Sequence, residues 1–124
     1  MFITKKSIIG IIKLAGIIST ESRLGSRGGL NLNDLSDSIT KAFSFKNIKA
    51  IVLLVNSPGG SPVQSALIAN RIRDIAKEKE IPVYCFIEDL AASGGYWLSC
   101  AADKIYAMES SIVGSIGVIT AGFG

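Results

Sequence analysis

Continuous apolar runs alternate along this chain with segments in which apolar residues recur every three or four positions. The run AIVLLV at residues 50–55 is typical of a strand in a sheet buried on both faces, and a second run, PVYCFI, follows at residues 82–87. Residues 62–79 between them have helical spacing, and Pro62 favours the first turn of a helix. The apolar stripe expected on this helix consists of Val63, Ala66, Leu67, Ala69, Ile72, Ile75 and Ala76. The pattern therefore predicts a strand, a helix and a second strand.

The same alternation continues on both sides of this unit. Further strands are expected at residues 7–19, 104–108 and 116–120, and further helices at residues 33–45 and 94–102. Asn31 or Asn33 is available to cap the first of these helices. Strands that alternate with helices indicate an α/β fold with a largely parallel sheet. A chain of 124 residues can bury a sizeable core, so we expect a single domain over residues 1–124.

The composition restricts which chemistry is available. Hydrophobic residues make up 48% of the chain and charged residues 19%, which argues against disorder. The absence of histidine excludes a Ser-His-Asp triad, a Cys-His dyad and a His-ligated zinc, so a hydrolytic serine would need another base. The two cysteines, Cys85 and Cys100, cannot form a four-cysteine zinc site. Both lie in apolar runs, where we expect small buried hydrophobic residues and no disulfide.

The charge and the N-terminal apolar stretch each exclude a class of partner. A net charge of +3, with aromatic residues at 7% and no recognisable nucleic-acid motif, gives no reason to expect a nucleic-acid partner. Residues 7–18 are apolar but contain Lys13, and they are too short to cross a bilayer. No clear cleavage site of a signal peptide follows them. We therefore expect a buried strand here, with no membrane anchor in this chain, and the compartment stays open.

The first junction with potential chemistry is NSPGGS at residues 56–61, between the strand at 50–55 and the helix that begins at Pro62. Two glycines allow positive φ angles and a close approach of the backbone to a ligand. The free N–H groups at the start of the helix can stabilise negative charge. The lysine of a phosphate-binding loop is missing. A plain strand–turn–helix junction, in which Ser57 shapes the turn before Pro58, explains this motif equally well.

The second junction, AASGGY at residues 91–96, follows the next strand in the same way. Ser93 stands between small residues on a tight strand-to-helix turn, as a nucleophile elbow requires. The alternative is that Ser93 caps the following helix. Tyr96 and Trp97 on that helix are expected to pack into the core. Together, the two junctions place a serine and two glycine-rich turns at the ends of neighbouring strands.

The motifs NSPGGS at 56–61, AASGGYW at 91–97 and SSIVGSIGV at 110–118 resemble those of peptidase family S49, the signal peptide peptidase A or protease IV family. The resemblance implies the ClpP/crotonase-like spiral of ββα units, assembled into homo-oligomeric rings. It also implies a Ser–Lys dyad endopeptidase that degrades signal-peptide-like or membrane-derived peptides without a metal or cofactor, in or near a bacterial membrane. By position, Ser93 matches the family nucleophile, and the backbone N–H groups of Gly60 and Gly94 match the oxyanion hole.

The lysine base of the family has no counterpart in this sequence. The resemblance places it downstream of Gly124 in single-repeat members and in the other repeat of double-length members, so we expect the chain to stop before the family domain ends. Lys13 and Lys104 are expected at the surface. Two alternatives therefore stay open. One is a non-catalytic truncated copy or assembly subunit, and the other is a crotonase-type enzyme that acts on acyl-CoA without a serine nucleophile.

Overall fold

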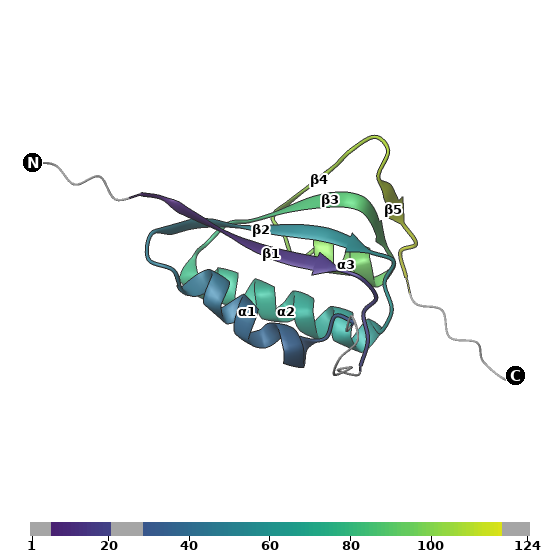
Figure 1. The fold of residues 1–124 in the computed structure, drawn as a ribbon, viewed down its shortest axis with the longest axis horizontal. Helices are drawn as coiled ribbons and strands as arrows, with labels where there is room; N and C mark the ends of the chain where they lie inside the picture. The colour runs from purple at the N-terminus through teal and green to yellow at the C-terminus, as the bar shows by residue number, and fades with distance from the viewer. Residues whose placement is uncertain (1–5, 21–28, 118–124) are drawn as a thin grey trace, which may run out of the picture.

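A parallel sheet forms the frame of the protein in the computed structural model, which describes residues 6–20 and 29–117 (Figure 1). The strands lie in the order β1-β2-β3-β4, β5 pairs with the end of β3, and every pairing is parallel. In chain order the elements are β1 (Ile8–Ala15), α1 (Leu32–Ser44), β2 (Ile48–Ser57), α2 (Pro62–Lys79), β3 (Val83–Ala92), α3 (Gly94–Ser99), β4 (Lys104–Ala107) and β5 (Ile112–Gly114). The expected α/β fold with a largely parallel sheet is confirmed.

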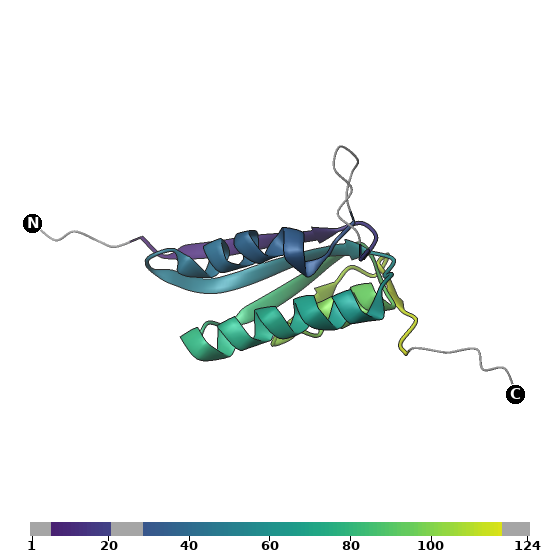
Figure 2. The ribbon, with the colours of Figure 1, turned by 90° about the horizontal axis from the view of Figure 1, so that it is seen from below.

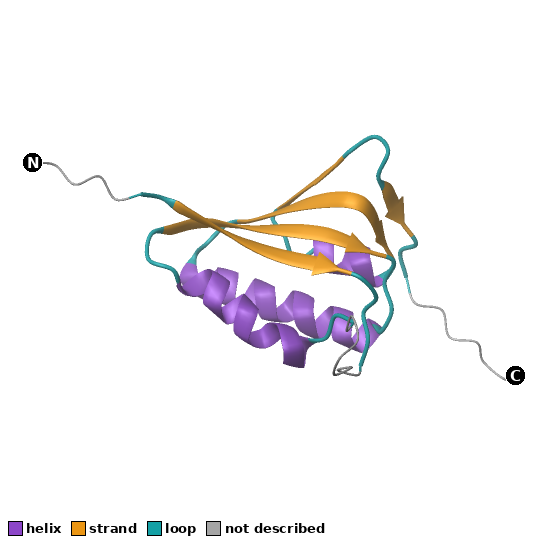
Figure 3. Ribbon diagram, viewed as in Figure 1, coloured by secondary structure: helices purple, strands orange, loops and turns teal. Residues whose placement is uncertain are grey.

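The helices cover one face of this sheet (Figures 2 and 3). Along β1 and β2 the side chains alternate between buried and more exposed positions, as a pleated strand requires when only one face is covered. Phe43 from α1, Ile68 from α2 and Leu53 from β2 are almost completely buried between the sheet and the helices. The core therefore lies in a single layer on the helical side.

The opposite face is not covered by any helix in the part of the chain that the structure describes. The register places Lys13, Leu54, Phe86 and Tyr106 side by side across β1, β2, β3 and β4 on this face. Leu54 is half-buried and the rings of Phe86 and Tyr106 stack with their centroids 5.1 Å apart. The expectation that β2 is buried on both faces is therefore wrong for these residues. On the second face, no helix of the described residues covers the side chains of β2, which are only partly buried.

The helix α2 has the bounds that the sequence predicts, but its buried stripe is displaced at the N-terminal end. Val63 and Leu67, which were expected in the core, are 65% and 41% exposed. Ser65 and Ile68 are fully buried in their place. The buried positions of α2 are Ser65, Ile68, Ala69, Ile72, Ile75 and Ala76. They follow the three- and four-residue spacing of one helical face, which Val63 and Leu67 do not share.

Other element boundaries differ from the expected ones. The strand β3 continues to Ala92, five residues beyond the predicted end at residue 87, and α3 ends at Ser99 and not at residue 102. In place of a strand at residues 116–120 the structure has β5 at Ile112–Gly114, and Ile116 and Gly117 are in no strand. Residues 118–120 lie outside the described part. The cap of α1 is Asn31, whose side chain accepts a hydrogen bond of 2.9 Å from the amide of Asp34.

The two cysteines have different environments. Cys85 is buried in β3 as expected, and burial raises the pKa of its thiol, so the thiol stays protonated at neutral pH. Cys100 follows the last turn of α3 and is exposed, so the expectation that it is buried is wrong. The core-facing positions of this short helix are taken by its glycines, Leu98 and Ser99. Within the described residues, no helix is long and apolar enough to cross a bilayer.

Phe43 and Phe45, two positions apart in the sequence, differ in burial and allow a test of the core. Phe43 is 1% exposed, whereas Phe45, just after α1, is 46% exposed. Replacing Phe43 with Ala should lower the free energy of unfolding by about 3–5 kcal/mol, because it removes a large buried side chain and leaves a cavity. The same replacement at Phe45 should cost under about 1 kcal/mol. Urea denaturation of both variants checks this, and equal losses would contradict the core described above.

Candidate active site

The turns that follow β2 and β3 are in direct contact at the carboxyl edge of the sheet. Parallel pairing aligns Ser57 with Ala91, so the two strands end side by side. A side chain added at Gly59 would lie 2.8 Å from the amide nitrogen of Gly94 and 2.9 Å from the carbonyl oxygen of Ala92. Because a Cβ atom does not fit at that distance, only glycine allows the two backbones to approach so closely. The two junctions that the sequence singles out therefore form one site.

Ser93 occupies the turn between β3 and α3 in an unusual backbone conformation, with φ 54° and ψ −119°. Its own backbone is held on both sides, since its N–H donates to the carbonyl of Gly114 at 3.0 Å and its carbonyl accepts from the N–H of Trp97 at 3.1 Å. Ser93 is exposed, and its hydroxyl caps no helix and makes no hydrogen bond with any described residue. The capping interpretation is therefore wrong, and the side chain is free to react.

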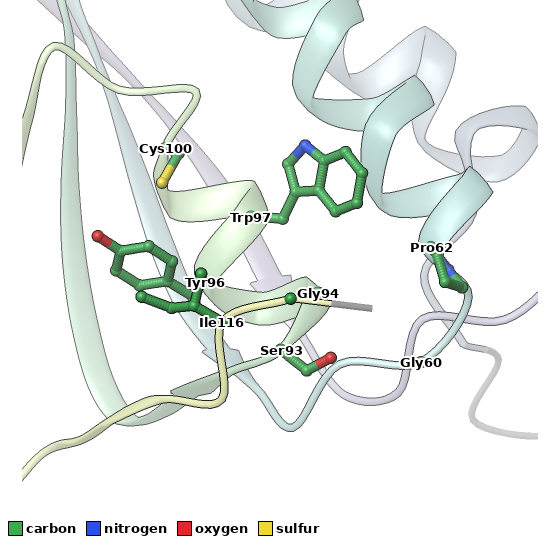
Figure 4. A pocket seen from close by; sticks show the side chains of 9 residues that line it. Gly60, Pro62, Ser93, Gly94, Tyr96, Trp97, Cys100 and Ile116 are labelled. Carbon is green, nitrogen blue, oxygen red and sulfur yellow. The ribbon is translucent and has the colours of Figure 1, made fainter. Parts of the chain in front are cut away.

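Gly60 and Gly94 line the same pocket as this hydroxyl. Around Gly60, Ile18 donates to the carbonyl of Gly59 and Ser61 donates to the carbonyl of Ile18, both at 2.9 Å. Within the described residues, neither the Gly60 amide nor the Gly94 amide donates to a protein acceptor. Gly94 is the first residue of α3, where an N–H has no partner inside the helix. Figure 4 shows the Ser93 hydroxyl pointing toward the turn that carries Gly60.

A pocket of about 280 Å³ opens next to these groups. It is lined by Gly60, Pro62, Ser93, Gly94, Tyr96, Trp97, Cys100, Ile116 and Gly117 (Figure 4). Tyr96 and Trp97 thus face the pocket, and the expectation that they pack into the core is wrong; Trp97 is 40% exposed. The side of α3 that faces the core carries Gly94, Gly95, Leu98 and Ser99, so Tyr96 and Trp97 lie on the other side of this short helix. The three predicted site residues, Ser93, Gly60 and Gly94, line this same pocket.

The described residues around the pocket offer the hydroxyls of Ser93 and Tyr96, the thiol of Cys100, the amides of the two glycines and an apolar wall, but no lysine or carboxylate. Lys13 on β1 and Lys104 on β4 are exposed, as expected. Glu88 and Asp89 are exposed on β3, and Asp89 accepts a hydrogen bond of 3.3 Å from Asn56. Among the described residues, no group of three or more His, Cys, Asp or Glu side chains could hold a metal ion.

Several residues of the site were missed by the sequence analysis. Pro62, Cys100, Ile116 and Gly117 line the pocket although none was assigned to it. For Pro62 a signal was available, because it directly follows the glycine-rich turn. Ile116 and Gly117 belong to the motif at residues 110–118, which was noted without a role at the site, whereas Cys100 reaches the pocket through the fold of α3 and no local pattern indicates it.

The backbone conformation of Ser93 is expected to lower the free energy of unfolding, because it is unfavourable for a residue other than glycine. A non-glycine residue in such a sparsely populated region costs on the order of 1–3 kcal/mol, which glycine avoids. Ser93→Gly should therefore raise the free energy of unfolding by about 1 kcal/mol relative to Ser93→Ala, since both variants lack the hydroxyl and only one relieves the backbone. Urea denaturation of the two variants checks this. A less stable glycine variant would show that the turn is not strained.

Residues 75–124 of the chain, which include Ser93 and Gly94, match the model of peptidase family S49. The chain is 42% identical over 120 residues to a putative signal peptide peptidase of Enterococcus faecium, covering 97% of this chain and 33% of that protein. It is 48% identical over 116 residues to a Brucella melitensis protein named a Na(+)/H(+) antiporter, covering 94% of this chain but 16% of that protein. The chain thus spans a third or less of the length of these relatives.

A solved structure shares the fold. It is a mutant of a membrane-bound stomatin-specific protease, with a TM-score of 0.65 and 21% sequence identity over 87% of this chain and 47% of the other. At this identity the similarity concerns the fold, and it agrees with the ClpP-like architecture that the motifs imply. Residues 75–124 thus match peptidase family S49, and the similarity to the Enterococcus faecium peptidase over most of the chain agrees with this match.

Proposed function

We propose that this chain carries the nucleophile and the oxyanion hole of a serine endopeptidase. The observation that carries the proposal is the exposed Ser93 hydroxyl, which shares a pocket with Gly60 and Gly94; neither this hydroxyl nor the two glycine amides hydrogen-bond to a described residue. The match of residues 75–124 to a peptidase family supports it. A strained strand-to-helix turn that presents a serine in this way is a recurrent feature of hydrolases with a serine nucleophile.

In the proposed reaction, the Ser93 oxygen attacks the carbonyl carbon of the scissile peptide bond while a base takes the hydroxyl proton. The carbonyl oxygen becomes an oxyanion that accepts hydrogen bonds from the N–H groups of Gly60 and Gly94. The C–N bond then breaks, the amine leaves with the proton, and an acyl-enzyme remains on Ser93. A water molecule hydrolyses the acyl-enzyme, releases the carboxylic acid and restores the serine.

The proposed base is a lysine from outside the described residues. The chain contains no histidine, and the lysines considered above lie on the surface of the sheet, away from the pocket lining. A lysine acts as a base near neutral pH only when burial or neighbouring cations lower its pKa to about 7–8. We propose that this lysine comes from another part of the full-length protein or from a second copy, and that it becomes buried next to Ser93 when the dyad forms.

The proposed substrates are signal-peptide-like or membrane-derived peptides. Pro62, Trp97 and Ile116 give the pocket beside Ser93 an apolar wall, which suits an apolar side chain of a peptide. A relative named a putative signal peptide peptidase supports the same class. Homo-oligomeric ring assembly stays a prediction. No observation favours the crotonase-type alternative. An enzyme that acts on acyl-CoA in this way needs no serine nucleophile, so the exposed Ser93 hydroxyl would have no role in it.

Covalent labelling tests the nucleophile. In the full-length gene product, a fluorophosphonate probe should label Ser93, because an activated serine attacks phosphorus as it attacks a carbonyl. Residues 1–124 alone should label at least about tenfold more slowly, since an unassisted hydroxyl is a weak nucleophile at neutral pH. Intact-mass spectrometry followed by peptide mapping measures both rates.

The matched control for labelling is Ser93→Ala, with Ser61→Ala as a second serine close to the pocket. The Ser93 variant should take up no probe, and the Ser61 variant should keep the rate of the unmodified protein. Equal labelling of the unmodified protein and the Ser93 variant would remove the nucleophile assignment. Failure of the full-length protein to be labelled at all would favour the non-catalytic alternative.

A crowded glycine tests the oxyanion hole. Gly60 has φ +146°, and a Cβ atom there would collide with the carbonyl oxygen of Ile18, so Gly60→Val must displace the amide. Loss of one oxyanion donor typically lowers kcat by ~10²–10³, and we expect at least ~10²-fold here with little change in KM.

The control for strain alone is Gly10→Val, in the first half of β1. A Cβ atom at Gly10 would meet the side chain of Ile51 at 2.7 Å and the carbonyl oxygen of Ala42 at 3.0 Å. This variant should lose stability, measured by urea denaturation, but its folded fraction should keep its kcat. Near-normal turnover in a folded Gly60→Val variant would mean that the turn has only a structural role.

A further inference from the structure

The hydroxyl of Ser57 lies at the centre of the two turns that form the site. Ser57 is the last residue of β2 and is completely buried. Its oxygen donates a hydrogen bond of 2.7 Å to the carbonyl of Gly16, which follows β1. It accepts one of 3.1 Å from the amide of Gly59. One buried hydroxyl therefore links the end of β1 to the glycine-rich turn, and both of its roles, donor and acceptor, are used.

Hydrogen bonds hold the peptide groups on both sides of Gly59, the second of which contains the Gly60 amide. The N–H of Gly59 is held by Ser57, and the carbonyl of Gly59 accepts a hydrogen bond of 2.9 Å from Ile18. A trans peptide group is planar, with its C=O and N–H pointing in opposite directions. Because the Gly59 carbonyl points at Ile18, the N–H of Gly60 points the other way. Gly60 lines the pocket of Ser93, and its amide, unlike that of Gly59, donates to no acceptor among the described residues.

The second turn also packs against Ser57. A Cβ atom at Gly95 would collide with the carbonyl oxygen of Ser57 and lie 3.1 Å from its Cβ. Gly95 is directly followed in α3 by the pocket residues Tyr96 and Trp97, and directly preceded by Gly94. A shift of Ser57 therefore changes the position of both amides relative to Ser93.

From this geometry we infer that Ser57 is a positioning residue: its hydroxyl orients the Gly59–Gly60 peptide group so that the Gly60 N–H faces the oxyanion. The inference rests on the proposed peptidase function. Ser57 touches neither the pocket nor the reacting atoms, so its effect passes through Gly59. Interactions that exist only in the transition state affect kcat and leave KM largely unchanged.

The test replaces Ser57 with Ala in the full-length gene product and measures cleavage of a fluorogenic peptide with leucine before the scissile bond. We expect kcat to fall by at least ~10-fold with KM changed less than about twofold, because the Gly60 amide is no longer held in place. A peptide aldehyde ending in leucinal forms a hemiacetal oxyanion on a serine. Its inhibition constant should rise by the same factor as kcat/KM falls.

Ser99→Ala is the matched control. Ser99 is also completely buried, and its hydroxyl donates to a backbone carbonyl, that of Gly95, at 3.0 Å inside α3. Its loss should affect stability in a similar way but leave kcat and aldehyde inhibition within about twofold, since it does not touch Gly59. If Ser57→Ala does not fold, Ser57→Cys provides a second variant that keeps a weaker donor and acceptor, with an intermediate loss of kcat expected.

Amide hydrogen exchange supplies a readout that does not depend on turnover. In Ser57→Ala, or in Ser57→Cys where the alanine variant does not fold, the Gly59 amide should exchange faster than in the unmodified protein, and Ser99→Ala should not show this. The inference is overturned if kcat is retained while Gly59 exchange rises, if Ser99→Ala loses kcat equally, or if aldehyde inhibition is unchanged. Ser93→Ala is measured in the same assay. If Ser93→Ala still cleaves the peptide, the proposed function fails. If Ser93→Ala is inactive while Ser57→Ala keeps its kcat, only the role of Ser57 is refuted.

Discussion

The contact between two backbone turns at the carboxyl edge of the sheet is the constraint on which the site depends. Gly59 of the first turn lies so close to Gly94 and Ala92 of the second that a Cβ atom does not fit. Parallel pairing of β2 with β3 brings the turns to the same edge, and glycine then allows backbone to pack on backbone. Because these two turns meet, Ser93, Gly60 and Gly94 line one pocket.

The site is held in place by the core beneath it. Ser93 keeps an unfavourable backbone conformation because hydrogen bonds to Gly114 and Trp97 fix it on both sides. Strain of on the order of 1–3 kcal/mol persists only where the surrounding structure over-determines the conformation. The buried residues Ile18, Ser57 and Ser65, which pack against Gly94 and Gly95 directly after Ser93, belong to that surrounding structure. Packing around the two turns thus supports the strained backbone at the carboxyl edge of the sheet.

In the proposed function, the described residues supply only part of the acyl-transfer site. A hydroxyl and two amides are present in the pocket, and the proposed lysine has to come from elsewhere in the full-length protein or from a second copy. The uncovered face of the sheet, where Phe86 and Tyr106 stack, is a separate feature of the same chain. The chain covers 33% and 16% of the length of two of its relatives.

The sequence by itself determined the fold class, the bounds of α2 and the three residues that line the pocket together. Pro62, the charged end of the helix and the glycine-rich turns are local signals, and local signals are readable without coordinates. The family resemblance, based on three motifs, agreed with the matched family model. The assignment of Ser93, Gly60 and Gly94 to catalytic roles stays a prediction.

The tertiary structure decided which side of each element is covered. Helical spacing shows that residues share a face, but not that the sheet covers Ile68 and leaves Val63 exposed. In the same way, only the packing of α3 turned Trp97 toward the pocket and left Cys100 at the surface. The hydrogen bond from Ser57 to Gly16 joins residues 41 positions apart, and no pattern along the chain specifies such a pair. Contacts of this kind exist only once the sheet has brought distant strands together.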